Sequence, residues 1–406
     1  MRPLTASAPT MKRLNLAAIL SVIRQAGPLP RTEIAERTGL TKATVTNLVG
    51  NLIAEGLVME ELPGRSTGGR RPVPVALNPR SRFVIGVDVG IHEVRVGATD
   101  LNAAPIVRQV FPLKRLTSPD QFLAILGDGV DTVLQHMLSV EGMTLDQWLG
   151  VGIGMHGIVD AEAGTAIFAP NFGLHNIPIR ETLQERFKAP VFVDNDVRAM
   201  AAGERWFGSP GAGSDFLFVN VGLGVGAAVV VRGETLTGAS GSAGEIGHTV
   251  VEPNGRPCAC GKKGCLETVA SGPSIARRGV EAVRGGIPSL IPEVAGGDLD
   301  SVTAYTIYQA ASAGDSLARS LFNAAGTHLG NTIGQLVNAL DPDAVIIGGG
   351  VSGAGIYFWH PLVQRVRQVA VETAGAHLRV MPSTVSDATL IGAATMVLHS
   401  LFSPKF

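Results

Sequence analysis

The sequence predicts a winged helix-turn-helix domain followed by a larger α/β region that carries a structural metal site. Three observations lead to this fold class. Helical patterns separated by a glycine turn fill residues 14–55, and patterns of buried strands and helices alternate from residue 82 onward. All three cysteines of the chain fall within residues 258–265, which indicates a metal site and not a disulfide framework.

Length and composition limit the class of protein. The chain has 406 residues, which is too long for one ordinary core and predicts two or three domains. A hydrophobic content of 45% with 17% charged residues is typical of a globular protein. The net charge of −1 creates no overall field that attracts nucleic acid, so DNA binding requires a locally basic surface. The apolar stretch at residues 14–23 is too short for a signal peptide or a membrane span, so we expect a cytoplasmic protein with no membrane partner.

The N-terminal helices have the pattern of a DNA reader. A first amphipathic helix covers residues 14–25 and stops at the Gly27-Pro28 pair. A second helix covers residues 31–38 and ends at Gly39. After that turn, Thr41 is a good N-cap for a third helix that runs to about residue 55. Two helices joined by such a turn form the helix-turn-helix arrangement.

Two strand patterns, at residues 57–61 and 73–77, predict a β-hairpin that would form the wing. Side chains that can donate to phosphates or read base edges lie on the third helix and in the wing loop. We expect DNA contacts from Thr41, Lys42, Thr44, Thr46 and Asn47 on the helix, and from Arg65, Arg70 and Arg71 on the wing. Helical domains that bind protein partners share this pattern, but the threonine-rich helix start and the wing arginines favour DNA.

The remainder of the chain predicts an α/β architecture with parallel strands, because strands and helices alternate along it. Expected strands cover residues 83–88, 93–99, 150–154, 191–193, 216–221, 226–231 and 344–347, and expected helices lie within residues 121–139, 179–187 and 304–340.

A zinc site is the most specific chemistry that the sequence contains. Cys258, Cys260 and Cys265 follow His248, and three thiolates with one imidazole complete a tetrahedral set for Zn²⁺. A closed set of four protein ligands is structural and not catalytic. Three small buried cysteines in a reducing cytoplasm are the alternative. Their confinement to residues 258–265 argues against it.

Polar and glycine-rich segments at strand ends point to a ligand site. Glycine-rich turns follow strands at residues 88–90, 222–226 and 348–350. Backbone amides in such turns cradle phosphates, although glycine also serves ordinary tight turns. Residues 194–196, Asp-Asn-Asp, follow another strand, where polar groups usually contact ligands in α/β folds. An aspartate there can accept a hydrogen bond from a sugar hydroxyl or take its proton as a general base.

These motifs together resemble the ROK family, which groups repressors and sugar kinases. The residues that carry the resemblance are 244–248 (Gly-Glu-Ile-Gly-His) with 258–267, and 338–342 with 346–352. The resemblance covers essentially the whole chain, and the winged helix places it with the family's repressors, which respond to xylose, N-acetylglucosamine or glucose status. It implies a two-lobed fold similar to actin and hexokinase, with sugar bound in the cleft.

The resemblance also implies domain boundaries and sugar contacts. After a DNA-binding domain at residues 1–80, lobe 1 covers residues 81–194, and a C-terminal helix at about 387–402 packs back on it. Lobe 2 covers residues 195–386 and holds the zinc motif and a dimerisation surface. The implied sugar contacts are Asn171, Asn195, Asp196, Glu245, His248 and Glu267. His248 would then bind zinc and face the sugar at once, so that the metal orders one wall of the pocket.

The chain departs from the kinases of the family in its phosphate-binding turns. Ile91 and His92 follow Gly90 where the kinases have a Gly-Thr pair, and Leu223 replaces a threonine or similar polar residue between two glycines. Both changes remove phosphate-binding groups, so we expect no ATP binding and no enzyme activity. Asp196, whose counterpart is the catalytic base of the kinases, is retained. His156 stands where many relatives have a proline.

Three functions remain open at this point. The first is a repressor of carbohydrate uptake or catabolism genes, a homodimer or homotetramer whose affinity for operator DNA falls when a monosaccharide binds. The second is an ATP-dependent sugar kinase with an added DNA-binding domain, and Asp196 favours it while Leu223 opposes it. The third is a regulator that senses a protein partner, which the polar residues of the expected pocket argue against.

Overall fold

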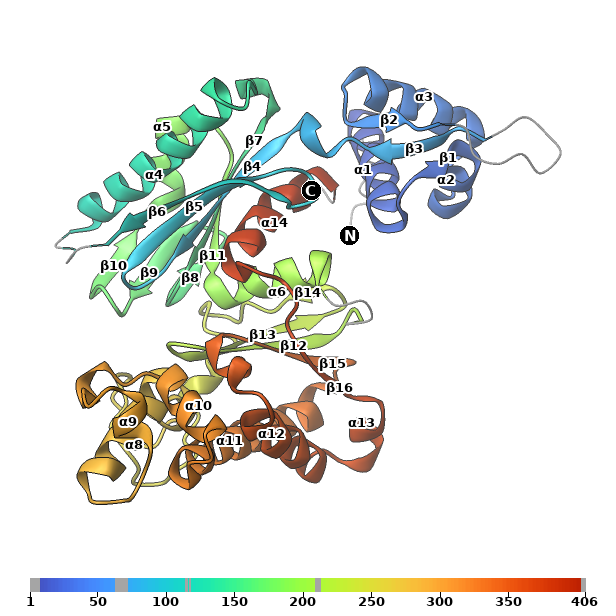
Figure 1. Cartoon of the computed structure of the whole chain (residues 1–406). Helices are drawn as coiled ribbons and strands as arrows, with labels where there is room; N and C mark the ends of the chain where they lie inside the picture. Colours follow the sequence, from blue (N-terminus) through green and yellow to red (C-terminus); the bar gives the residue numbers. More distant parts are fainter. Residues whose placement is uncertain (1–7, 63–71, 114–115, 117, 209–212, 403–406) are drawn as a thin grey trace. The chain divides into compact units, whose positions relative to one another are not determined.

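The structure is a computed structural model of the chain, and it describes residues 8–62, 72–113, 116, 118–208 and 213–402 (Figure 1). The contacts between residues divide the chain into two compact units. Unit 1 comprises Met1–Ala199 together with Asp387–Phe406, and unit 2 comprises Met200–Ser386.

The N-terminal part of unit 1, here called the reader domain, has three helices and a small sheet: α1 (Ala8–Ala26), β1 (Leu29–Pro30), α2 (Arg31–Thr38), α3 (Lys42–Ala54), β2 (Val58–Glu60) and β3 (Pro74–Leu77). Gly39 has a φ of 70°, the left-handed conformation that lets the chain turn from α2 into α3. The predicted apolar face of α3 is buried at Val45, Leu48, Val49 and Leu52. The helix-turn-helix that the sequence predicts is therefore confirmed.

The wing of the reader domain is an antiparallel hairpin. β2 pairs with β3 so that Val58 lies opposite Leu77, and β1 pairs with the other edge of β3. The predicted wing arginines, Arg65, Arg70 and Arg71, lie outside the described residues.

The rest of unit 1 is built on a five-stranded mixed sheet with the strand order β11-β7-β4-β5-β6. β7 and β11 run parallel to β4, and β5 and β6 continue from it as antiparallel hairpins. A three-stranded sheet, β10-β9-β8, follows β7 along the chain. The elements are β4 (Phe83–Val89), β5 (Glu93–Thr99), β6 (Pro105–Pro112), α4 (Pro119–Ser139), β7 (Trp148–Met155), β8 (Ile158–Asp160), β9 (Thr165–Ala169), β10 (Leu174–Ile177), α5 (Ile179–Phe187), β11 (Val191–Asn195) and the start of α6 (Asp196–Phe207).

The C-terminal helix α14 (Ala388–Phe402) belongs to unit 1 and packs on β4 and β7 of this sheet (Figure 1). Two strand glycines make the close approach possible. A Cβ atom on Gly86 would lie 2.5 Å from the carbonyl oxygen of Leu390, and one on Gly152 would overlap the carbonyl of Ala393. Larger residues at these positions would therefore push the helix off the sheet.

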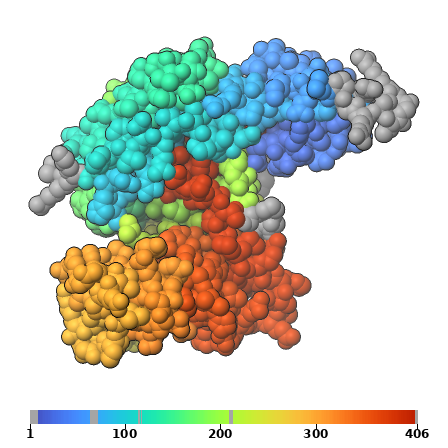
Figure 2. Space-filling view, viewed as in Figure 1, coloured from blue at the N-terminus to red at the C-terminus, as the bar shows by residue number. Residues whose placement is uncertain are grey.

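Unit 2 has a second five-stranded mixed sheet, ordered β14-β13-β12-β15-β16, and a helical region that forms much of its face in view in Figure 2, in orange and red. Its strands are β12 (Phe216–Val221), β13 (Val225–Val231), β14 (Glu234–Thr235), β15 (Ala344–Gly348) and β16 (Arg379–Pro382). Its helices are α7 (Glu267–Ala270), α8 (Gly272–Arg284), α9 (Ile291–Val294), α10 (Ala304–Ser312), α11 (Ser316–Leu340), α12 (Ile356–Val369) and α13 (Glu372–His377).

The two sheets share one topology. In each, the first strand in sequence is central, its next two partners are antiparallel hairpin strands, and its other neighbours are two parallel strands. Two α/β lobes of the same design confirm the predicted fold class. None of the described helices is long and apolar enough to cross a membrane.

Candidate functional site

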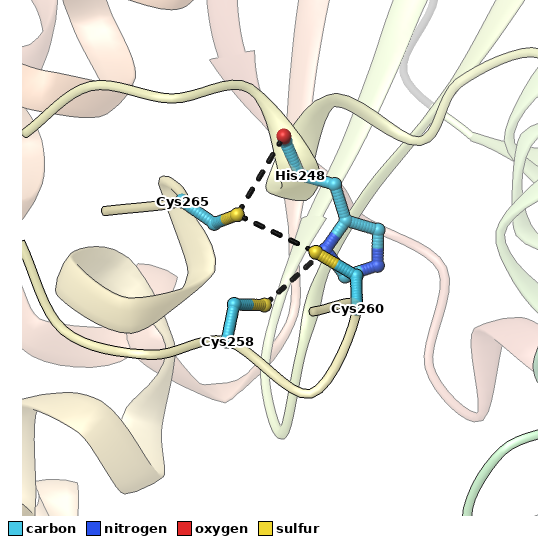
Figure 3. Close-up of side chains that lie close together, drawn as sticks. All are labelled: His248, Cys258, Cys260 and Cys265. Atoms are coloured by element: carbon cyan, nitrogen blue, oxygen red, sulfur yellow. Dashed lines mark hydrogen bonds between the residues drawn. The ribbon is translucent and has the colours of Figure 1, made fainter. Parts of the chain in front are cut away.

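The predicted metal ligands converge in unit 2. His248 ends a short 3₁₀ turn, Ile246–His248, and the three cysteines come from the loop before α7 (Figure 3). The ligand atoms of His248, Cys258, Cys260 and Cys265 all lie within 4.8 Å of one another. Nδ1 of His248 is 3.6 Å from Sγ of Cys258, and Sγ of Cys260 is 3.6 Å from Sγ of Cys265. Zinc–sulfur bonds of about 2.3 Å in a tetrahedron imply edges of about 3.7 Å. The four residues therefore form a cluster consistent with a structural zinc site.

The backbone of this loop has little regular structure of its own. Two isolated bridges, Val250 with Cys265 and Pro257 with Lys263, and backbone hydrogen bonds such as that from the Cys258 amide to the Lys262 carbonyl oxygen hold it together. Burial, together with the neighbouring thiols of Cys260 and Cys258, raises the pKa of the Cys265 thiol to about 12. Three neighbouring thiolates repel one another, and a zinc ion bound by these residues would supply the positive charge that stabilises them.

Two predicted sugar contacts, Glu245 and Glu267, are near neighbours of the metal ligands in sequence. His248 has its Nδ1 atom toward Cys258, and its Nε2 atom lies 3.8 Å from Oε2 of the exposed Glu245. A metal-binding histidine whose other nitrogen faces a carboxylate has a fixed ring orientation. Glu267 begins α7, two residues after Cys265, and its Oε2 atom accepts a hydrogen bond from the backbone of Val225 at 3.1 Å. The metal ligands and these carboxylates therefore belong to one continuous segment.

In unit 1, the strand end after β11 is locked by a buried ion pair. Arg198 is only 2% exposed, and its Nε atom donates to Oδ1 of Asp194 over 2.6 Å. It also donates to the carbonyl oxygen of Val159 over 3.0 Å. Burial raises the pKa of Asp194, and the charge of Arg198 opposes that rise. The pair joins β8, β11 and α6, and it therefore helps to position Asn195 and Asp196, which lie between its members.

Those two residues, Asn195 and Asp196, are predicted sugar contacts. The Asn195 side chain caps α6, because its Oδ1 accepts from the amides of Val197 at 3.0 Å and Arg198 at 3.2 Å. Its Nδ2 donates to the carbonyl oxygen of Gly157 over 3.0 Å. One amide hydrogen of Asn195 therefore remains for a ligand. Asn171, the remaining candidate of unit 1, is exposed in the turn between β9 and β10.

Asp196 and Asp88 form a pair of interacting carboxylates. Burial raises the pKa of Asp196, and His156 opposes that rise. Burial raises the pKa of Asp88, at the end of β4, to about 6, although Arg95 lies 3.2 Å from its Oδ2. The charge of Asp196 contributes to the rise at Asp88.

Substituting Asp88 by asparagine is expected to stabilise the chain more at pH 7 than at pH 5. The native pKa of about 6 exceeds the ordinary 3.8, so the native state holds more protons than the unfolded state between these values. The unfolding free energy therefore falls as pH rises through this window, and Asp88→Asn removes that loss. The advantage of the variant should grow by about 1 kcal/mol from pH 5 to pH 7. Urea unfolding at both pH values measures it, with the exposed Asp146→Asn as control; equal gains at both pH values would contradict it.

The reader domain presents the exposed side of α3. Thr41 caps the helix by accepting from the amide of Thr44 at 3.2 Å, and their hydroxyls lie 2.9 Å apart. The Thr46 hydroxyl donates to the carbonyl oxygen of Lys42 over 2.8 Å. Among the described residues, Asn47 is exposed and makes no side-chain hydrogen bond. Of the predicted helix contacts, Lys42 and Asn47 therefore have polar groups that are fully free.

The glycine turn after β12 borders a cavity of about 500 Å³ in unit 2. Leu223 in this turn is 62% exposed. The cavity wall contains no charged side chain among the described residues and is mainly apolar, with Leu223, Pro273, Ala276, Val302, Tyr305 and Val351. Phosphate groups would find no cation there.

Comparisons with known proteins follow the same division of the chain. The model of the ROK family matches residues 84–400, and that of the MarR family matches residues 15–71. A xylose repressor of Caldicellulosiruptor bescii is 32% identical over 394 residues, 97% of each chain. The DNA-binding transcriptional dual regulator NagC of Escherichia coli is 32% identical over 393 residues, 97% of this chain and 94% of its own.

Kinase relatives match a shorter part. A glucokinase of Halalkalibacterium halodurans is 34% identical over 322 residues, 78% of this chain and 95% of its own. The solved structure of a ROK family transcriptional regulator, described as a homolog of the E. coli MLC protein, superposes with a TM-score of 0.84 at 24% identity and covers 97% of both chains. The two repressors and the transcriptional regulator thus match 97% of this chain, and the glucokinase matches 78% of it.

Proposed function

The chain belongs to the ROK family, and we propose that it is a transcriptional repressor of sugar uptake or catabolism genes that leaves its operator when a monosaccharide binds. One observation carries the proposal. The reader domain and the ROK lobes are present on one chain, and full-length similarity to a xylose repressor and to NagC extends across both. We further propose that it acts in the cytoplasm as a homodimer or homotetramer, because a two-fold operator needs two readers at a fixed spacing.

The sugar contacts that we assign lie on both units. Asn171, Asn195 and Asp196 belong to unit 1, and Glu245, His248 and Glu267 belong to unit 2. Carboxylates and amide groups are the partners that sugar hydroxyls bind. The proposal requires the sugar to bind one conformation of the protein better than another, and the sugar then shifts the population by that difference in affinity. A changed spacing of the readers then costs operator affinity.

We also propose that the chain does not phosphorylate its sugar. Ile91 and His92 follow Gly90 in place of the Gly-Thr pair of the kinases, and the exposed Leu223 lies at an uncharged cavity with no hydroxyl to offer a phosphate. The retained Asp196 supports the alternative of a sugar kinase. On the proposal, Asp196 accepts a hydrogen bond from a sugar hydroxyl and the pocket binds without turnover.

The decisive experiment selects binding sites for the purified chain from random duplex DNA. Fluorescence anisotropy on the selected site is then measured with D-xylose, D-glucose or N-acetyl-D-glucosamine at millimolar concentration. Release by one sugar, with no ATP turnover in a coupled assay, is the expected result. Failure to select any DNA would overturn the repressor proposal. DNA binding that no sugar alters would favour a regulator that senses a protein partner, and ATP turnover would favour the kinase.

Asp196→Asn is expected to separate sugar sensing from DNA binding. The variant keeps the shape of the side chain and removes its charge, and charge-assisted hydrogen bonds contribute about 1.5–3 kcal/mol each. Sugar affinity should therefore fall about 10-fold to 150-fold, while operator affinity without sugar is unchanged. Isothermal titration calorimetry and anisotropy measure the two quantities, with Asp146→Asn as the control. An unaltered sugar affinity would remove Asp196 from the site.

A further inference from the structure

The imidazole of His156 has one nitrogen in use and one without a partner. His156 lies in the turn between β7 and β8, and its Nδ1 atom is 3.2 Å from the carbonyl oxygen of Val89. A carbonyl oxygen is an acceptor, so Nδ1 must carry the hydrogen of this bond. In the neutral ring, Nε2 is then a bare acceptor. This Nε2 atom is buried and has no hydrogen-bond partner.

The other unpartnered buried polar atoms of the described residues have a different character. They are the Thr99 hydroxyl and the Nε atoms of Arg24, Arg31 and Arg365. A guanidinium has further donors, and those of Arg31 and Arg365 bind Glu60 and Asn331. An imidazole has two nitrogens only, so the second nitrogen of His156 needs a donor from elsewhere.

The surroundings of His156 are those of the assigned sugar contacts in unit 1. Its ring packs edge-on against Phe172, with centroids 4.9 Å apart, and Phe172 follows Asn171 directly. The next residue, Gly157, accepts the Asn195 side chain over 3.0 Å. Burial raises the pKa of the Asp196 carboxyl, and His156 is near enough to oppose that rise. The turn that carries His156 therefore contacts or adjoins all three candidates.

We infer that His156 is a further sugar-binding residue, whose Nε2 atom accepts a hydrogen bond from a hydroxyl of the same ligand that Asn195 and Asp196 hold. The inference rests on the proposed function. A hydroxyl is the matching group, since it donates to Nε2 and carries no charge. A phosphate or carboxylate at this point would meet the carboxylates of Asp196 and Asp88 and is disfavoured. His156 thus selects a ligand with a free hydroxyl at one position.

The test is a thermodynamic cycle between the side chain and each sugar hydroxyl. His156→Phe keeps an aromatic ring against Phe172 and removes both nitrogens, and His156→Gln keeps a polar side chain. The matched control is His175→Phe, because His175 is an exposed histidine that stacks on Phe168 at 4.4 Å. Calorimetry uses D-xylose, D-glucose and N-acetyl-D-glucosamine, followed by the monodeoxy analogues of each sugar that binds.

His156→Phe should weaken sugar binding about 3-fold to 10-fold, the scale of one neutral hydrogen bond, and His156→Gln should weaken it less. One deoxy analogue should bind the wild-type chain more weakly than the parent sugar by the same factor. On His156→Phe, that analogue and the parent sugar should bind with equal affinity. Unchanged operator affinity and zinc content show that the variants are folded. The ¹⁵N resonances of the sugar-free chain should show a protonated Nδ1 and an unprotonated Nε2.

Three results would overturn the inference. The first is equal sugar affinity of His156→Phe and wild type. The second is that every deoxy analogue loses as much affinity on His156→Phe as on the wild-type chain, which would mean that no hydroxyl interacts with His156. The third is a protonated Nε2 in the sugar-free neutral ring. Each can occur while sugars still release DNA, and then the proposed function stands. A wild-type chain that binds DNA but none of the sugars removes the sugar response and this inference together.

Discussion

Replacing Cys265 by serine is expected to remove zinc from the chain and to loosen the segment from Glu245 to Glu267. Cys265 is fully buried, and its Sγ lies 3.6 Å from that of Cys260. Serine does not replace a thiolate as a zinc ligand, so three ligands would remain. Structural zinc in small domains contributes roughly 10–16 kcal/mol of apparent binding free energy at neutral pH. Without it, this loop has no helix or strand of its own and would depend on two isolated bridges and a few turn hydrogen bonds for its shape.

The consequences of losing zinc should be confined to unit 2. Glu245 faces the histidine ligand, and Glu267 follows the last cysteine, so both carboxylates lose their fixed positions. Sugar affinity should then fall below detection, while operator affinity persists because the reader domain belongs to unit 1. Metal analysis, calorimetry and anisotropy measure the three effects, and hydrogen exchange reports the loop itself.

Ala259→Ser is the matched control for this prediction, because Ala259 is exposed in the same loop between two ligands. It should retain zinc and sugar binding. A Cys265→Ser chain that keeps one zinc and normal protection of the loop would show that the cluster does not depend on this thiolate. A chain that loses zinc but binds sugar as before would separate the metal from the sugar site.

The sequence predicted well those parts of the structure that depend on residues close to one another in the chain. The turn at Gly39, the cap at Thr41 and the ligand spacing from Cys258 to Cys265 are short-range features, and the structure has all of them. The two-lobed architecture came from resemblance, since periodicity alone predicts alternating elements and no strand order. The shared strand order of the two sheets arises from pairings between distant segments.

Residues whose role depends on distant partners escaped the sequence analysis. Arg198 is buried against Asp194, and only the spacing of four residues across a strand-helix junction could have indicated the pair. His156 was noticed as a departure from relatives, but its unpartnered nitrogen follows from the position of Val89 on another strand. The sheet of β8, β9 and β10 was not predicted, because its strands are short and only partly alternating.

The exposed face of α3 also shows that sequence alone does not tell which polar groups are free to bind DNA, and it leads to a prediction for Asn47. The sequence predicts DNA contacts from several polar residues at the start of α3. In the structure, the hydroxyls of Thr41, Thr44 and Thr46 make hydrogen bonds within the helix and its cap. Asn47 is exposed with a free amide, which is the group that pairs with the N6 and N7 atoms of adenine in the major groove. We therefore expect Asn47 to read one adenine in each half-site.

Asn47→Ala should reduce the difference in binding free energy between adenine and the other bases at one position of each half-site by about 1–3 kcal/mol. This is roughly a 5-fold to 150-fold change in relative affinity. Lys42→Ala is the contrasting variant. A lysine that binds phosphate contributes equally on all sequences, so this variant should weaken every site uniformly and lower the slope of log affinity against log salt by about 1. Selection from random DNA and competition binding at fixed salt measure both effects. If Asn47→Ala also weakened all sequences alike, Asn47 would be a backbone contact, and base reading would have to come from groups other than its amide.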